Sequence, residues 1–186
     1  MPTSTPARKA PLPVSFESEL DIVADRAIIR LPQEASATLP SRGQVAVDGT
    51  INEIAFETVV EPDGARGHWI SVDDALHERL GLSSGDSVTV TITPRAEWPE
   101  PNLPKDFEAA LTEATDLSDT WTGITPMARW EWVRWVNATR NTETRERRIE
   151  VSLSKMRAGK RRPCCFNLSS CTDPELSKNG KLLGIE

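Results

Sequence analysis

The sequence predicts an α+β protein, in which a small six-stranded β-barrel is followed by a C-terminal helical segment. Apolar and polar residues alternate through residues 14–94, which is typical of half-buried strands. Prolines in residues 95–103 predict a stiff linker, and apolar residues then recur at helical spacing through residues 104–159. We expect residues 1–13 to be a disordered tail and residues 160–186 to be irregular, because neither stretch can bury much apolar surface.

Six short strands are expected in the first half. They cover residues 14–22, 27–31, 45–51, 54–60, 68–72 and 87–92. In the last of them, apolar residues point one way and hydroxyl groups the other. Asn52-Glu53 is expected to close a hairpin, although glycine would tolerate positive φ better than Glu53. One short helix is expected from Asp73 to Leu80, with Gly81 as its cap. We expect a barrel of the double-split type, because closure removes exposed sheet edges.

Three helices are expected after the linker. Pro104 stands at the start of the first. Thr125 is the capping residue of the second, which is expected to run from Pro126 to about residue 139. The third is expected over residues 142–157 and ends before Gly159.

Four of the six tryptophans stand close together, at positions 121, 130, 132 and 135. Large rings cover much surface, so we expect them to pack the helices against the barrel. A second interpretation is an exposed platform for stacked bases or another ligand, with Arg129 and Arg134 beside Trp130. In the helix expected from Pro126 to about residue 139, Glu131 and Arg134 are expected to lie opposite the apolar side.

The charge is distributed unevenly along the chain. Lys and Arg number 22 against 28 acids, a net charge of −6. Residues 15–95 hold 6 basic and 14 acidic side chains, so the barrel is expected to repel phosphate groups. Residues 140–162 hold nine basic and three acidic side chains, and this stretch is the candidate anion-binding surface. The candidate residues are Arg147, Arg148, Lys155, Arg157, Lys160, Arg161 and Arg162.

The basic stretch also has a structural interpretation. Glu143 and Arg147 stand at i,i+4, and cations near a helix C-terminus interact favourably with its dipole. Arg145 is placed where it could pair with acids of the barrel. The sequence leaves open whether these charges bind nucleic acid, bind another anionic surface, or serve the fold.

We expect no catalytic residue and no cofactor. The two histidines, His68 and His77, stand in no hydrolase motif, and the chain has no P-loop, no Rossmann fingerprint and no zinc-protease helix. Both histidines are expected to have surface or packing roles. A carboxylate-based site or a small-ligand pocket in the barrel would leave no motif, so an enzyme or ligand carrier stays an alternative.

The three cysteines do not predict a metal site. Cys164 and Cys165 are adjacent, and Cys171 with Asp173 would have to complete the ligand set, which differs from the paired spacing of structural zinc. Reduced thiols are expected, because the count is odd and the spacing is not that of a secreted disulfide framework. A redox role would require an exposed thiol of low pKa.

The run from Arg42 to Ile92 resembles a known bacterial family. It contains VDGTIN, then GHW before a strand, then LGLSSGDSVTV after the short helix. These motifs are similar to those of domain of unknown function 1905, with Glu53 where the family usually has glycine. The last motif is also similar to the barrels of AbrB and MazE type, which bind DNA as dimers. The acidic barrel disfavours that activity here.

Residues 104–160 resemble a helical segment called YdeI or OmpD-associated, which is named for bacteriocin protection. The resemblance rests on Pro104, Ala109, Ala110, Leu111, Trp135, Val136, Glu143, Thr144, Arg145, Arg148, Ile149 and Gly159. It implies a bacterial barrel-plus-helices protein that helps cells survive membrane-active peptides. It implies no catalytic residue.

We therefore expect a non-enzymatic binding or stress-protection protein. No stretch is long and apolar enough for a membrane span or a secretory signal, so a cytoplasmic location is expected. The sequence does not identify the partner, and both another protein and a second copy of the chain stay open. Binding of nucleic acid or another anionic surface through the basic stretch is the alternative.

Overall fold

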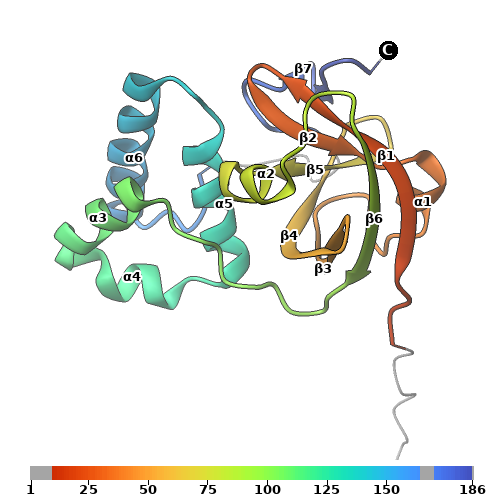
Figure 1. The fold of residues 1–186 in the computed structure, drawn as a ribbon. Helices are drawn as coiled ribbons and strands as arrows, with labels where there is room; N and C mark the ends of the chain where they lie inside the picture. The colour runs from red at the N-terminus through yellow and green to blue at the C-terminus, as the bar shows by residue number, and fades with distance from the viewer. Residues whose placement is uncertain (1–9, 164–169, 186) are drawn as a thin grey trace, which may run out of the picture.

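Six strands form a closed antiparallel barrel in the computed structural model, which describes residues 10–163 and 170–185 (Figure 1). The strands are β1 (Val14–Val23), β2 (Arg26–Arg30), β3 (Val45–Ile51), β4 (Ile54–Pro62), β5 (His68–Val72) and β6 (Ser87–Pro94). They are hydrogen-bonded in the order β1-β2-β5-β4-β3-β6. The predicted α+β class and the six-stranded barrel are confirmed. Most of the expected disordered tail, residues 1–9, lies outside the described residues.

The alternation of side chains fills the barrel. Val88, Val90 and Ile92 of β6 are buried in its core, whereas Thr89 of the same strand faces outward. Strand β1 belongs to two parts of the barrel wall, because its first six residues pair with β6 and its last four with β2. This change of partner closes the sheet.

The predicted hairpin at Asn52-Glu53 and the predicted helix from Asp73 to Leu80 are both confirmed. Asn52 and Glu53 have φ values of 45° and 67°, as a tight reversal between β3 and β4 requires. Helix α2 (Asp74–Leu80) begins where the Asp73 side chain accepts a hydrogen bond from the Leu76 amide, and it ends at Gly81, which has a left-handed conformation.

The expectation of one helix in the barrel half is wrong. A second helix, α1 (Gln33–Ala37), follows Pro32 and packs Ala35 into the barrel core. Its five residues are too few to show a helical period in the sequence.

The helical part has more helices than expected (Figure 1). It contains α3 (Lys105–Glu113), a 3₁₀ turn (Thr115–Leu117), α4 (Ser118–Gly123), α5 (Pro126–Asn137) and α6 (Thr142–Arg157). The 3₁₀ turn and α4 were not expected, because Ser, Asp, Thr and Gly are weak helix formers. The linker packs on α5, where the Trp130 indole donates a hydrogen bond to the Pro99 carbonyl oxygen.

The tryptophans of the helical part form a core of their own. Trp132 is fully buried, and Trp121 meets Phe107 edge-to-face at 5.7 Å between ring centroids. Both tryptophans pack with other residues of α3–α6, not with the barrel core. The expectation that these rings cover the barrel is therefore wrong for Trp121 and Trp132.

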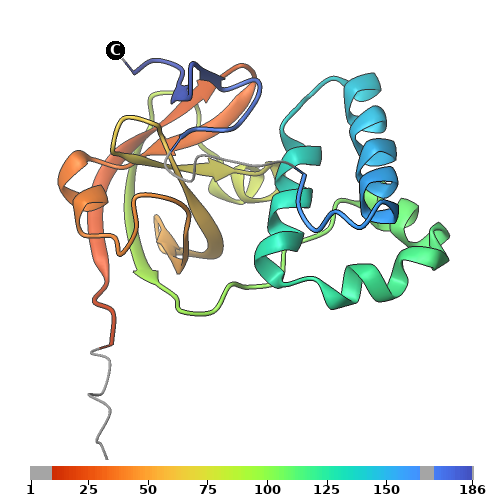
Figure 2. The same ribbon diagram turned by 180° about the vertical axis from the view of Figure 1, so that it is seen from behind.

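Residues 170–185, the C-terminal segment, lie against the barrel (Figure 2). They contain a small hairpin, β7 (Ser177–Lys178) and β8 (Lys181–Leu182). Leu176 and Leu182 cover Ile28 and Trp69, two side chains on the outside of the barrel wall. We expected an irregular tail here, but these few apolar residues pack because the barrel offers them a matching apolar patch.

The close pairing of β3 with β6 depends on Gly49, which lies opposite Ile92. A Cβ atom at this position would stand 1.8 Å from the carbonyl oxygen of Thr91. We expect Gly49→Ala to lower the free energy of unfolding by about 3 kcal/mol, because the two strands must move apart. Urea denaturation followed by tryptophan fluorescence measures this. Gly123→Ala is the control, since nothing lies within 4 Å of its added Cβ. Equal stability of both variants would contradict the prediction.

Candidate functional site

Two of the predicted anion-binding residues lie on Trp135. The guanidinium carbon of Arg148 is 5.7 Å from the centroid of the Trp135 ring, and the ammonium nitrogen of Lys155 is 5.5 Å from it. Arg148 also donates a hydrogen bond to the Trp135 carbonyl oxygen, and Lys155 donates one to the Pro163 carbonyl oxygen. These cations hold α6 and the following loop on α5.

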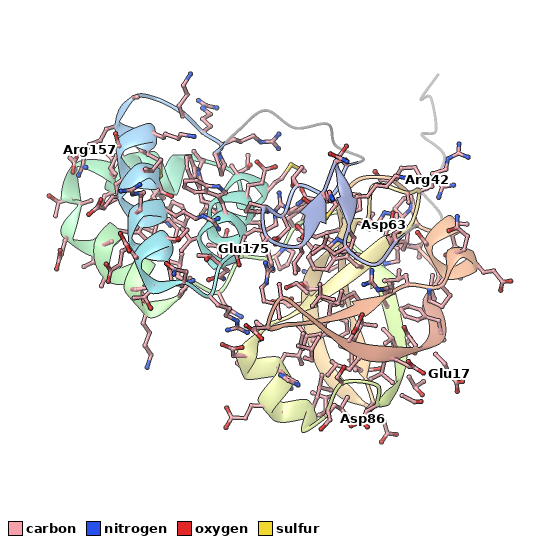
Figure 3. All side chains as sticks on the ribbon, turned by 90° about the horizontal axis from the view of Figure 1, so that it is seen from above. Glu17, Arg42, Asp63, Asp86, Arg157 and Glu175 are labelled. Atoms are coloured by element: carbon pink, nitrogen blue, oxygen red, sulfur yellow. The ribbon has the colours of Figure 1, made fainter. Side chains whose placement is uncertain are left out.

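Two more of the predicted residues form ion pairs. Arg157, labelled in Figure 3, pairs with Asp116, and Arg162 lies 3.3 Å from a carboxylate oxygen of Glu131. Neighbouring Arg145 pairs with Asp106 of α3, so its expected pairing with a barrel acid is not found.

Arg147, Lys160 and Arg161 are exposed, and within the described part of the chain their charged groups make no ion pair. The seven candidate residues are therefore not equivalent: four are held by intramolecular contacts and three point to solvent. Anion binding at this stretch stays a prediction.

A buried group of charges lies where the barrel, the helices and the C-terminal segment meet. Glu61 at the end of β4 is only 4% exposed, and its Oε1 lies 3.0 Å from Nε of Arg134 on α5. Arg134 also donates a hydrogen bond to the Thr172 hydroxyl, at 2.7 Å. Gln44 donates one to Glu61. One arginine thus contacts all three parts of the molecule.

Burial raises the pKa of both acids in this group. The Glu61 carboxyl is removed from water, and this outweighs the lowering of its pKa by Arg134. Glu131 is 2% exposed, and burial raises its pKa against the opposing effect of Arg162. Its Oε2 atom has no hydrogen-bond partner in the described residues. The sequence places Glu131 opposite the apolar side of this helix, and the structure shows that its side chain is nevertheless buried.

No sequence pattern identifies Glu61, Glu131 and Arg134 as a group. The signals are an acid before Pro62 in an apolar strand and a Glu-Arg pair at i,i+3 in a tryptophan-rich helix. Neither signal shows that the strand and the helix meet.

A second buried ion pair attaches the C-terminal segment. Nη1 of Arg26 on β2 lies 2.7 Å from Oδ2 of Asp173, and both side chains are almost completely buried. The other oxygen of Asp173 accepts hydrogen bonds from the amides of Glu175 and Leu176. Both carboxylate oxygens of Asp173 therefore have partners within the protein.

No group of three potential metal ligands occurs among residues 10–163 and 170–185. Cys164 and Cys165 lie outside the described residues. Cys171 is buried, and burial raises the pKa of its thiol to about 11. That value is opposite to the lowered pKa that a redox-active thiol requires.

The space beside Glu61 is small. It is lined by Gln44, Glu61, Pro62, Arg134, Ser170, Cys171 and Thr172. Its volume is about 10 Å³, which is enough for one water molecule. An open groove of about 370 Å³ lies on the barrel wall between β1, Arg30 and the turn at Ser84 and Gly85. The barrel interior itself is filled by apolar side chains.

Both histidines join neighbouring elements. His68 lies between the Ser36 hydroxyl, 2.5 Å from Nδ1, and the Gly43 carbonyl oxygen, 2.9 Å from Nε2. Burial lowers the pKa of His68, so it favours the neutral ring that donates from Nε2 and accepts from Ser36. His77 binds the Leu82 carbonyl oxygen through Nε2.

The outer side of β1, β6 and β3 carries hydroxyl and acidic side chains, and we call it the acidic face. Its members are Ser15, Glu17, Glu19, Asp48, Thr89, Thr91 and Thr93. Glu17 lies beside Thr89 and Asp48 beside Thr93 in the strand register, and Figure 3 shows Glu17 at the outside of the barrel. Glu57, opposite Asp48 on β4, pairs with Arg95 at the edge of this face.

The comparisons with known families divide the chain at the linker. Residues 16–92 match the family described as domain of unknown function DUF1905. Residues 100–159 match the family described as Bacteriocin-protection, YdeI or OmpD-Associated, or OmdA. The chain carries a DUF1905 domain followed by an OmdA domain. Both resemblances drawn from the sequence are thereby confirmed, in the expected order. No curated protein matches the chain.

The similarity to AbrB and MazE barrels stays a prediction.

Among the described residues, none of the helices of the DUF1905 and OmdA domains is long and apolar enough to cross a membrane.

The Arg26–Asp173 pair is expected to be important for stability. Asp173→Asn removes the charge that balances a buried guanidinium, so we expect the free energy of unfolding to fall by about 3 kcal/mol. Urea denaturation measures the loss. Glu57→Gln removes the exposed partner of Arg95 and is expected to change stability by less than about 0.5 kcal/mol. A loss for Asp173→Asn no larger than that of the control would show that the pair does not hold the segment.

Cys171 is expected to be unreactive. A thiol pKa of about 11 leaves a much smaller thiolate fraction than the ordinary pKa of 9.0. We expect iodoacetamide at about pH 8 to alkylate Cys171 roughly 100-fold more slowly in the folded chain than in the chain unfolded in urea. Peptide mapping by mass spectrometry isolates this cysteine from the other two. Similar rates in both states would contradict the assigned burial.

Proposed function

We propose that this protein is a non-enzymatic binding protein of the bacterial cytoplasm that protects cells against bacteriocins by binding cationic, membrane-active peptides. The OmdA match supports a link to bacteriocin protection. Binding is favoured over catalysis because the histidines are engaged in packing contacts and the Cys171 thiol is protonated at neutral pH.

The acidic face is the observation that carries the proposal. Glu17, Glu19 and Asp48 are exposed on it, and none of the three has a cationic partner in the described part of the chain. The neighbouring hydroxyl groups can accept hydrogen bonds from ammonium or guanidinium groups. Such a face attracts a cationic peptide over about one Debye length, roughly 8 Å in physiological salt.

The charge of the whole barrel supports the same partner. Residues 15–95 carry 14 acids against six basic residues. One of those six, Arg26, is neutralised by its buried ion pair with Asp173. A polyanion would meet repulsion here. A polycation would meet net attraction from the barrel.

Fluorescence anisotropy of a labelled cationic amphipathic peptide tests the proposal. The full chain is expected to bind the peptide, and binding is expected to weaken with added salt. Changing Glu17→Gln, Glu19→Gln and Asp48→Asn together is expected to weaken binding roughly tenfold, because each exposed charge contributes a few tenths of a kcal/mol or more. A culture that expresses this variant is also expected to lose the survival advantage that the unmodified chain gives.

The matched control removes the same number of acids elsewhere. Glu143→Gln, Glu146→Gln and Glu150→Gln change three exposed acids of α6 and are expected to leave binding and survival unchanged. If both triple variants weaken binding equally, the attraction comes from net charge and not from the acidic face. If the unmodified chain does not bind the peptide even at low salt, the proposed function is wrong.

A further inference from the structure

Strand β4 has a neighbouring strand along only one of its two edges for most of its length. On one side, residues 54–60 pair with β3 without a break. On the other side, among the described residues, the register with β5 covers Glu61 and Pro62 only, and α2 lies beside the first part of the strand. The barrel therefore closes at the C-terminal end of β4, and the residues before Glu61 have an open edge.

The hairpin fixes which backbone groups face this open edge. In a two-residue hairpin, the residues that flank the turn, here Ile51 and Ile54, exchange both of their backbone hydrogen bonds. Every second residue of β4 from Ile54 onward therefore bonds to β3, and the peptide groups of Ala55 and Glu57 point the other way. In agreement, Nη2 of Arg79 on α2 donates a hydrogen bond to the Ala55 carbonyl oxygen at 3.1 Å. Neither the Ala55 amide nor the Glu57 amide has an acceptor in the described part of the chain.

The two sides of the strand at this edge have opposite character. Ile54 and Phe56 point inward, are half-buried and pack against the barrel core. Ala55 and Glu57 point outward and are exposed, and Asp48 of the acidic face lies opposite Glu57 on β3. A strand added to this edge would therefore have apolar neighbours on its inner side and acidic neighbours on its outer side.

We propose that the open edge of β4 binds an extended peptide as an added strand, and that this peptide alternates cationic and apolar residues. The inference rests on the proposed function and specifies how the cationic peptide binds. Carbonyl oxygens of the peptide accept hydrogen bonds from the amides of Ala55 and Glu57, and a peptide amide donates one to the Glu57 carbonyl oxygen. The apolar side chains of the peptide cover Ile54 and Phe56, and its cations lie beside Glu57 and Asp48.

The charges around the edge favour a cationic peptide over a second copy of the chain. The side chain of Glu57 is 56% exposed although it pairs with Arg95, and Asp48 has no cationic partner among the described residues. Two copies that met at this edge would bring these acids together. Arg79 covers the Ala55 carbonyl oxygen, so it protects one acceptor of the edge and leaves both amides uncovered.

N-methylated peptides test the strand pairing on the unmodified chain. The probe is a labelled peptide of alternating Lys and Val, measured by fluorescence anisotropy. One derivative carries N-methyl groups on its Lys amides and the other on its Val amides. Alternate amides of a strand point to opposite edges, so only one of the two sets can bond to β4. We expect one derivative to bind about tenfold more weakly than the unmethylated peptide, and the other to bind as tightly as that peptide.

A proline substitution tests the edge from the side of the protein. Ala55→Pro removes the amide hydrogen that faces the open edge and leaves the hydrogen bonds with β3 in place. It is expected to weaken binding of the unmethylated peptide about tenfold, with a circular dichroism spectrum like that of the unmodified chain. Ala55→Val keeps the amide hydrogen and suits a strand, so this control is expected to bind as the unmodified chain does.

The outcomes separate this inference from the proposed function. If the unmodified chain does not bind the alternating peptide even at low salt, both are wrong. If the peptide binds and the triple variant of Glu17, Glu19 and Asp48 weakens binding, but both methylated derivatives bind equally, only the strand addition is overturned. A folded Ala55→Pro chain with unchanged binding overturns it as well. Dimerisation that Ala55→Pro abolishes and the peptide does not affect would assign the edge to a second copy and overturn the proposal.

Discussion

The arrangement of the whole chain depends on the contacts that the guanidinium group of Arg134 makes. This group reaches Glu61 at the end of a barrel strand and Thr172 in the C-terminal segment from its own position on α5. Two hydrophobic cores with no shared apolar cluster in the described chain need a polar connection if they are to keep a fixed orientation. A buried ion pair is a directional connection, but it is a costly one, because both charges lose water when it forms. The orientation of the two domains is therefore less stable than either domain itself.

The C-terminal segment covers apolar side chains on the barrel wall and also supplies residues of the polar interface around Glu61. It lies outside both matched families, whose regions end at residues 92 and 159. Without it, Ile28 and Trp69 would stand uncovered on the barrel wall. The segment brings the cysteine, threonine and aspartate that complete the charged group, so the surroundings of Glu61 depend on a part of the chain that neither family describes.

The sequence predicted what depends on local periodicity and turn chemistry. The alternation of apolar residues gave the strands, and Asp73 and Gly81 gave both ends of α2. It did not predict α1, which is too short to have a period, or α4, whose residues are weak helix formers. The C-terminal hairpin depends on an apolar patch 100 residues or more away in the chain, and no local pattern can show that.

The candidate site was harder to predict than the fold, because a charge in a sequence does not show whether it faces water. Glu131 stands on the side of α5 that the sequence pattern marks as polar, but that side faces the loop after α6 and the barrel. The basic stretch was visible, yet most of its cations are occupied by Trp135 and nearby acids.

These pairings decide where the net charge of the protein acts. Arg129, Arg140, Arg145 and Arg157 neutralise acids of the linker, α2, α3 and the 3₁₀ turn. The acids of the acidic face have no such neighbours among the described residues, apart from Arg95 at its edge. A net charge of −6 therefore concentrates on the barrel, although the sequence is rich in arginine near its other end. A ligand that approaches the barrel meets negative charge, and this attracts cations before any specific contact forms.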